Sequence, residues 1–143
     1  PTLKRTPFVL RQIVPLGLVL DSYPGPLGQV LANLINNALR HGLDGLDEGE
    51  IVIAAHGQDE KWIVLSVADN GKGIVESMIP RIFEPFVTTR LGSGGTGLGL
   101  HIVYNIVSGV LGGRIDVSSI EGKGATFTLT LPRVAPQMAV VDA

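Results

Sequence analysis

Asp69-Asn-Gly-Lys-Gly73 and Gly92-Ser-Gly-Gly-Thr-Gly-Leu-Gly-Leu100 are two glycine clusters that follow an asparagine-rich segment, Asn33-Leu-Ile-Asn-Asn-Ala-Leu-Arg-His41. Glycine at this density lets the backbone approach a bound anion, because no Cβ atom covers the amide groups. A single glycine loop would carry little information. An asparagine helix, an acidic glycine turn and a glycine loop that opens a second helix, in this order, indicate a nucleotide site.

The composition describes an ordinary globular chain. Its 143 residues are 45% hydrophobic, and a formal charge of −2 without any basic run argues against nucleic acid as a partner. The absence of cysteine excludes a disulfide framework, a thiolate metal site and a cysteine nucleophile, and it suits a cytoplasmic domain. No apolar run has the length of a membrane span, so we expect no direct membrane contact by this part of a parent protein that can itself be membrane-anchored.

The chain begins at Pro1 without an initiator methionine, and we therefore expect a piece of a longer protein. We expect residues 1–143 to form a single domain with its core over about 8–132 and a tail over 133–143. Apolar, β-branched runs predict strands over 8–14, 16–21, 51–56, 62–68, 114–119 and 125–131. The turns over 57–60 and 121–124 predict two hairpins, 51–56 with 62–68 and 114–119 with 125–131. Helical periodicity predicts helices over 27–41, 76–83 and 96–111. The elements predict an α/β (α+β) two-layer sandwich, with helices on one face of a mixed, mostly antiparallel sheet.

The asparagine-rich helix carries a polar stripe. Asn33, Asn37, Arg40 and His41 stand at i, i+4, i+7 and i+8 beside the apolar face. An asparagine oxygen suits Mg²⁺, a hard cation, so Asn37 is the candidate metal ligand and Arg40 the candidate phosphate contact. The alternative is that these side chains only cover a solvated helix face.

Asp69 ends an apolar run and begins a glycine turn. A carboxylate there can accept a hydrogen bond from an exocyclic amine such as that of adenine, although Asp-Asn-Gly is also common turn chemistry. The second cluster, Gly95-Thr-Gly-Leu-Gly99, leads directly into a helix, so its amides and the helix dipole can hold phosphate oxygens. It has neither the Walker pattern nor a strand directly before it, and its alternative is a flexible linker.

These motifs together resemble the ATP-binding (HATPase) domain of sensor histidine kinases, in the superfamily shared with gyrase, heat-shock chaperone and mismatch-repair ATPases (GHKL). Asn33-Leu-Ile-Asn-Asn37-Ala is similar to the N box and Asp69-Asn-Gly-Lys-Gly73 to the first glycine box. The F box, the second glycine box and the closing strand motif correspond to Phe83-Glu-Pro-Phe-Val-Thr-Thr89, Gly95-Thr-Gly-Leu-Gly-Leu100 and Gly122-Lys-Gly-Ala-Thr-Phe127. The resemblance runs from about Phe8 to Pro132.

The resemblance implies a Bergerat-type fold that holds ATP between the asparagine helix and a mobile lid over about 84–96. It implies that Asn37 holds Mg²⁺, that Asp69 reads adenine and that Thr126 supports Asp69 through water. The implied catalytic residues are Asn33, Asn37 and Arg40. The implied ATP contacts are Asn33, Asn37, Arg40, His41, Asp69, Gly71, Gly73, Ile74, Thr88, Thr89, Arg90, Gly95, Thr96, Gly97, Leu98, Gly99, Leu100 and Thr126.

One position separates the branches of this superfamily. Members that activate water or a hydroxyl typically carry a glutamate base where this chain has Asn33, which accepts no proton at neutral pH. A neutral imidazole needs no base, so Asn33 favours phosphotransfer to histidine over ATP hydrolysis. The family's acceptor is a helix histidine followed by an acidic residue and a proline, and neither His41, His56 nor His101 has that context.

The sequence therefore predicts a kinase fragment that binds Mg²⁺-ATP and serves a histidine on an adjoining dimerisation domain of the same protein, with a response regulator downstream. Two alternatives belong to other classes. One is a degenerate regulatory module that binds nucleotide without transferring phosphate, and the intact Asn37, Asp69 and glycines argue against loss of binding. The other is a stand-alone ATPase or serine kinase, against which the missing glutamate argues.

Overall fold

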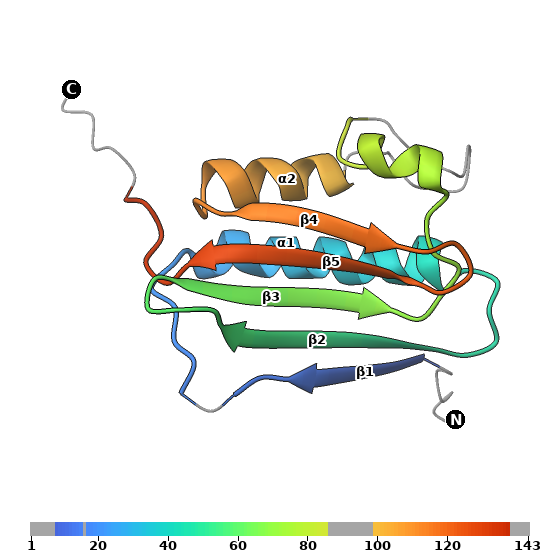
Figure 1. The fold of residues 1–143 in the computed structure, drawn as a ribbon, viewed down its shortest axis with the longest axis horizontal. Helices are drawn as coiled ribbons and strands as arrows, with labels where there is room; N and C mark the ends of the chain where they lie inside the picture. Colours follow the sequence, from blue (N-terminus) through green and yellow to red (C-terminus); the bar gives the residue numbers. More distant parts are fainter. Residues whose placement is uncertain (1–7, 16, 86–98, 138–143) are drawn as a thin grey trace, which may run out of the picture.

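The computed structural model describes residues 8–15, 17–85 and 99–137, in which helices pack against one sheet (Figure 1). The strands are β1 (Phe8–Ile13), β2 (Gly49–Gly57), β3 (Trp62–Asp69), β4 (Arg114–Ser119) and β5 (Ala125–Pro132). The helical elements are α1 (Pro24–Asn37), the π-helical turn η1 (Ala38–Gly42), the 3-10 helix η2 (Glu76–Arg81) and α2 (Gly99–Gly109).

The sheet is mixed and mostly antiparallel, as predicted. Its strand order is β1-β2-β3-β5-β4, in which β1 runs parallel to β2 and the other neighbours are antiparallel. Both predicted hairpins, β2 with β3 and β4 with β5, are confirmed. The central pairing of β3 with β5 places Asp69 opposite Ala125, so the acidic glycine turn adjoins the closing strand motif.

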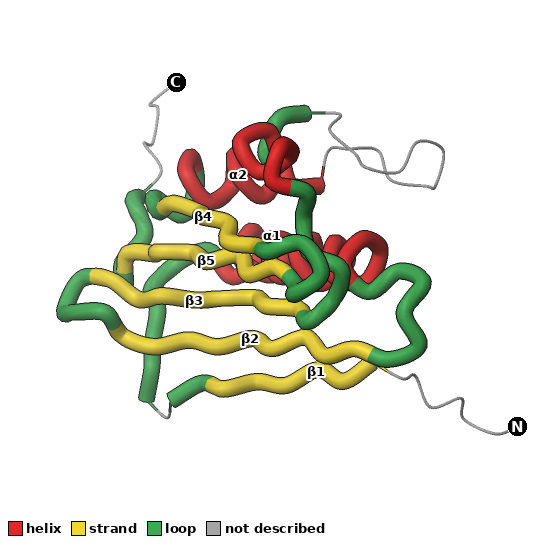
Figure 2. Tube along the Cα trace, turned by 45° about the vertical axis from the view of Figure 1, so that its right-hand side comes forward, coloured by secondary structure: helices red, strands yellow, loops and turns green. Residues whose placement is uncertain are grey.

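One face of the sheet forms the core. Alternate residues of β2, β3 and β5 are buried, as expected for strands with one covered face. The helices cover this face (Figure 2). The two α-helices each contribute two fully buried side chains to the same cluster: Val30 and Leu34 from α1, and Val103 and Val107 from α2. The predicted two-layer arrangement, with helices on one face, is therefore confirmed.

The predicted strand over 16–21 is wrong for the part of it that is described. After β1 the chain passes Pro15 and Gly17, whose φ of +81° belongs to the left-handed region that favours glycine. Residues 17–20 join no strand, and Asp21 makes only an isolated parallel bridge to Val134. The apolar composition of this segment reflects partial burial of Leu18 and Leu20 against the core instead of strand pairing.

The first helix begins earlier and ends differently than its periodicity predicts. It starts at Pro24, where Pro24 and Pro26 occupy the first turn and need no intrahelical N–H. After Asn37 the winding widens, and the Leu43 amide donates to the Ala38 carbonyl at 2.8 Å. Because π winding has a different periodicity, the α-helical spacing assumed through His41 is wrong beyond Asn37.

The start of the predicted tail is packed. The Asp21 amide donates to the Arg133 carbonyl, the Ala135 amide donates to the Asp21 carbonyl, both at 2.8 Å, and only 7% of Ala135 is exposed. The Tyr23 hydroxyl also donates to the Pro136 carbonyl at 2.6 Å. The core thus extends past Pro132. Within 8–15, 17–85 and 99–137, none of the helices combines the length and the apolarity that a bilayer crossing requires.

Gly28 lies inside α1, where an added Cβ would meet no atom within 4 Å. Gly28→Ala should raise the unfolding free energy by about 0.5–1 kcal/mol, because alanine loses less backbone entropy in a helix. Urea denaturation measures the change. Gly42→Ala is the contrasting variant and should destabilise, since its Cβ would lie 2.7 Å from Asp69 Oδ1. An unchanged or lowered stability of Gly28→Ala would contradict this account.

Candidate functional site

Asp69 stands where β3 leaves the core. One carboxylate oxygen accepts the Gly71 amide at 2.9 Å, and the side chain is half-buried. Burial raises the pKa of the Asp69 carboxyl above its ordinary value, while hydrogen bonds from the Gly71 and Ala125 backbone amides act in the opposite direction. A partly desolvated acceptor of this kind favours a ligand that brings a donor.

Glycines allow three segments to meet around Asp69. A Cβ on Gly71 would collide with the Gly42 carbonyl, and a Cβ on Gly124 would collide with the Asp69 carbonyl. The end of the asparagine helix, the first glycine turn and the last hairpin are therefore in backbone contact. The Lys72 amide donates to the Gly42 carbonyl at 2.8 Å and fixes the first two segments together. Gly42 and Gly124 make this packing possible, and neither is among the site residues that the sequence predicts.

Ser119 fixes the second half of the turn. Gly73 has a φ of +74°, and the next amide, that of Ile74, donates to Ser119 Oγ at 2.8 Å. The same hydroxyl donates to the Gly124 carbonyl at 2.7 Å. One side chain of β4 thus joins the first glycine turn to the β4–β5 turn. No sequence signal identified Ser119, because its partners become neighbours only in the folded sheet.

The asparagine helix reaches the start of α2. Asn33 and Asn37 are half-buried on α1, and Asn33 Nδ2 donates to the Gly99 carbonyl at 3.3 Å. On η1, Arg40 is exposed and His41 is half-buried. The structure thus brings together Asn33 and Gly99, in the described end of the second glycine box. Leu100, the next residue, packs partly buried against the core.

Thr126 lies differently than the resemblance implies. The register pairs Asp69 with Ala125 and pairs Ala68 with Thr126. Since successive side chains of a strand point to opposite faces, Thr126 projects from the face opposite to that of Ala125, which is the buried one. The group that β5 offers to Asp69 is the backbone amide of Ala125. Seven other candidates lie outside the described residues: Thr88, Thr89, Arg90, Gly95, Thr96, Gly97 and Leu98. Most of the expected lid over about 84–96 lies outside them as well.

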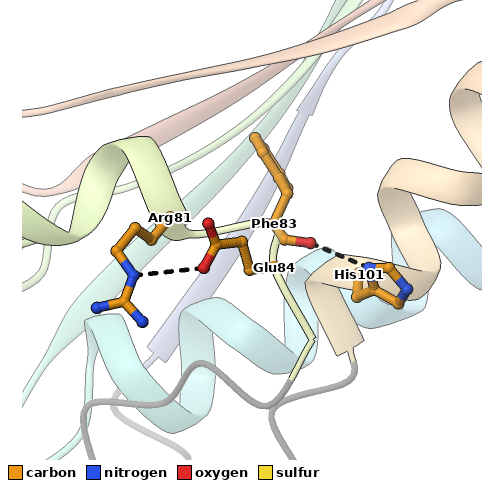
Figure 3. A network of polar contacts seen from close by, with 4 residues as sticks. All are labelled: Arg81, Phe83, Glu84 and His101. Atoms are coloured by element: carbon orange, nitrogen blue, oxygen red, sulfur yellow. Dashed lines mark hydrogen bonds and ion pairs between the residues drawn. The ribbon is translucent and has the colours of Figure 1, made fainter.

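The segment after η2 adjoins α2 (Figure 3). Phe83 places its ring 5.8 Å from that of Tyr104 and, edge-on, 6.2 Å from that of the buried Phe127. His101 Nδ1 lies 3.2 Å from the Phe83 carbonyl oxygen, and nearby Arg81 Nε pairs with Glu84 Oε2 at 3.3 Å. The predicted helix over 76–83 is a 3-10 helix that ends at Arg81, so Phe83 is free of helical bonding to point its carbonyl at α2.

Comparison with known proteins agrees with this geometry. The model of the family described as "Histidine kinase-, DNA gyrase B-, and HSP90-like ATPase" matches residues 23–135. The chain is 44% identical over 118 residues to the sensor histidine kinase ZraS of Salmonella typhi, which covers 82% of this chain and 24% of ZraS. It is 39% identical over 109 residues to sporulation kinase E of Bacillus subtilis, covering 76% of this chain and 14% of that kinase.

Solved structures show the same fold. The catalytic domain of the histidine kinase ThkA superposes with a TM-score of 0.77 at 28% identity, covering 90% of this chain and 81% of that domain. Full-length ShkA in complex with AMPPNP gives a TM-score of 0.71 at 29% identity, covering 92% of this chain and 27% of ShkA. The chain spans 24% or less of the length of the curated relatives ZraS and sporulation kinase E. Its family match includes the asparagine helix and both glycine boxes, and the chain therefore belongs to the family of histidine kinase-, DNA gyrase B- and HSP90-like ATPases.

Proposed function

We propose that this chain binds Mg²⁺-ATP and presents the γ-phosphate to a histidine on an adjoining dimerisation domain of its parent protein, which then serves a response regulator in two-component signalling. The observation that carries the proposal is the half-buried Asp69 carboxylate, against which the side-chain-free Gly42 and Gly71 pack. Family membership supports the same reading.

Asp69 has the environment that adenine recognition needs. The exocyclic amine of adenine donates hydrogen bonds, whereas guanine presents a carbonyl oxygen at the corresponding position. A carboxylate facing that oxygen would be left without a donor, which costs roughly 1–3 kcal/mol. Gly42 and Gly71 leave no side chain beside the carboxylate, because a Cβ atom on Gly42 would lie 2.7 Å and one on Gly71 3.0 Å from Asp69 Oδ1.

The phosphates would lie between α1 and the start of α2. The first amides of a helix have no intrahelical acceptor, and those of Gly99 and Leu100, where the described part of α2 begins, would bind anionic oxygens. Asn33 ties Gly99 to α1, and the exposed cation of Arg40 lies on η1, which directly continues α1. Electrostatic complementarity and positioning would then supply most of the catalysis.

A Mg²⁺ ion fits the donor set through Asn37. In the part of the chain that the structure describes, no three His, Cys, Asp or Glu side chains are grouped to hold a metal. A cation here would therefore use the neutral oxygen of Asn37 together with nucleotide and water oxygens, which is the coordination that Mg²⁺ prefers. Bound Mg²⁺ would offset phosphate charge. Asn33 lies where a base would stand and cannot take a proton, so the acceptor must be a nucleophile that needs none, such as a neutral imidazole.

Asn37→Ala tests the metal assignment. It should lower the affinity for ATP about tenfold in the presence of Mg²⁺ and change it little in the presence of a chelator, because only the metal-dependent part is lost. Isothermal titration measures both affinities. Asn36→Ala is the matched control, since Asn36 is exposed on the same helix. Equal Mg²⁺ dependence in Asn37→Ala and the parent chain would show that Asn37 is only a surface residue.

Phosphotransfer distinguishes a kinase from a regulatory module that only binds nucleotide. The parent protein, incubated with γ-labelled ATP, should incorporate label that is released by acid and stable to alkali, as expected of phosphohistidine. Label stable to acid would indicate a serine kinase, and release of inorganic phosphate without labelled protein would indicate an ATPase. Binding of ATP without either product would support the degenerate module.

A further inference from the structure

The imidazole of His101 contacts Phe83, and the two residues lie on opposite sides of the segment 86–98 in the sequence. His101 lies in the first turn of α2, and its Nδ1 atom is 3.2 Å from the Phe83 carbonyl oxygen in a partly buried contact (Figure 3). The two residues are 18 positions apart in the chain. The contact therefore fixes the segment that follows η2 to the beginning of α2.

The contacts of the two ring nitrogens of His101 are both consistent with the same tautomer. A carbonyl oxygen only accepts, so Nδ1 must carry the hydrogen. In the neutral ring Nε2 is then an acceptor, and Asn105 Nδ2, a donor, lies 3.2 Å from it. Asn105 is one helical turn further along α2 and holds the ring in its orientation. His101 is thus a directed donor and not a solvent-facing side chain of the helix surface.

The packing of the Phe83 ring holds the Phe83 carbonyl in place. The Phe83 ring packs edge-on against Phe127, which is 2% exposed, and also contacts the Tyr104 ring of α2. From the other side, Asn33 of α1 donates to the Gly99 carbonyl at 3.3 Å. The first turn of α2 is consequently held between α1 and the Phe83 segment. Removing the His101 contact would leave Asn33 as the remaining described side-chain hydrogen bond to this turn.

We infer that His101 is a positioning residue that holds the first turn of α2 against Phe83, so that the turn's amides keep their direction toward the nucleotide phosphates. This inference rests on the proposed function. It assigns His101 no contact with the nucleotide and no proton transfer. His101 would act on the ligand through the amides of Gly99 and Leu100. Its loss should therefore weaken binding of the phosphates and leave binding of the base unchanged.

Comparing ATP with adenosine tests the inference, because both carry the base that Asp69 would recognise and only ATP carries the phosphates. In the full chain, His101→Ala should weaken ATP binding about threefold to tenfold, as expected for one lost hydrogen bond, and leave adenosine binding unchanged. His101→Asn should restore most of the affinity, because its amide nitrogen can take the place of Nδ1. Ser108→Ala is the control, since Ser108 is exposed on α2 and its hydroxyl donates to the Tyr104 carbonyl within the same helix.

The tautomer supplies a readout that does not depend on binding. Nitrogen-15 NMR of the His101 side chain at alkaline pH should show a protonated Nδ1 and an unprotonated Nε2, and the reverse assignment would overturn the inference. Equal ATP affinity in His101→Ala and the parent chain would overturn it as well, while leaving the proposed function standing. Parallel loss of ATP and adenosine binding, or no rescue by His101→Asn, would also overturn it. Failure of the parent chain to bind ATP at all would instead refute the proposed function.

Discussion

Replacing Asp69 with asparagine should lower the affinity for ATP tenfold or more. The variant keeps the side-chain shape and an oxygen for the Gly71 amide, which Asp69 accepts at 2.9 Å. It loses the charge that strengthens a hydrogen bond from the adenine amine, and its own amide hydrogens would oppose that amine. Titration with ATP, ADP and GTP measures the effect, and the parent chain should prefer the adenine nucleotides clearly.

The same substitution should leave the nucleotide-free fold at least as stable. Burial raises the pKa of Asp69, so the protonated carboxyl stabilises the fold fully below the ordinary pKa of 3.8, and this stabilisation is lost as the pH rises through the folded-state pKa. At neutral pH the parent chain therefore holds a partly desolvated charge that the asparagine variant lacks. Urea unfolding from acidic to neutral pH should show the parent chain losing stability relative to Asp69→Asn.

Asp116→Asn provides the matched control. This variant makes the same chemical change, from carboxylate to amide, on an exposed side chain. Asp116 Oδ2 lies 3.3 Å from Arg114 Nε. The ATP affinity of the variant should equal that of the parent chain. If Asp69→Asn and Asp116→Asn bind ATP equally well, or if the parent chain binds GTP as tightly as ATP, then Asp69 does not read the base and the proposed site is wrong.

Gly124→Ala should be among the most destabilising single substitutions in this chain, costing roughly 3 kcal/mol or more of unfolding free energy. Gly124 has a φ of +92°, which strains any larger residue, and its Cβ would collide with the Asp69 carbonyl and lie 3.0 Å from the Asn70 Cα. Both neighbours are backbone atoms and cannot move without opening the junction between β3 and β5. The variant should therefore also lose ATP affinity, because Asp69 would shift.

A substitution at Gly122, in the same turn, distinguishes the cost of backbone strain from the cost of a steric clash. Gly122 has a φ of +84°, but an added Cβ would meet no atom within 4 Å. Gly122→Ala should therefore cost only about 1 kcal/mol, the backbone term alone, and should bind ATP normally. Thermal and urea unfolding of both variants give the comparison. Similar losses at the two positions would mean that the contact between Gly124 and Asp69 contributes nothing beyond backbone strain.

Local patterns were sufficient for most of the elements. The two hairpins are confirmed because strand alternation and turn residues act over a few positions, as in β2 and β3. Where local reading failed, a tertiary contact decided the outcome. Leu18 and Leu20 pack against the core without strand pairing, and Ala135 is buried next to Asp21, whose carbonyl accepts the Ala135 amide. The π turn after Asn37 likewise departs from the spacing that the sequence suggests.

The motifs also predicted the family and named Asn37, Asp69 and the glycine boxes as candidates, since side-chain chemistry and glycine spacing are properties of the chain itself. Their roles at the site remain predictions. The tertiary structure alone decided which backbone meets Asp69 and which residues fix the turns around it. Gly42, Ser119 and the pairing of His101 with Phe83 join segments far apart in sequence, so no local pattern records them. The strand register likewise decided the position of Thr126. Asp69 pairs with Ala125, and the next residue of β5, Thr126, points to the opposite face of the sheet.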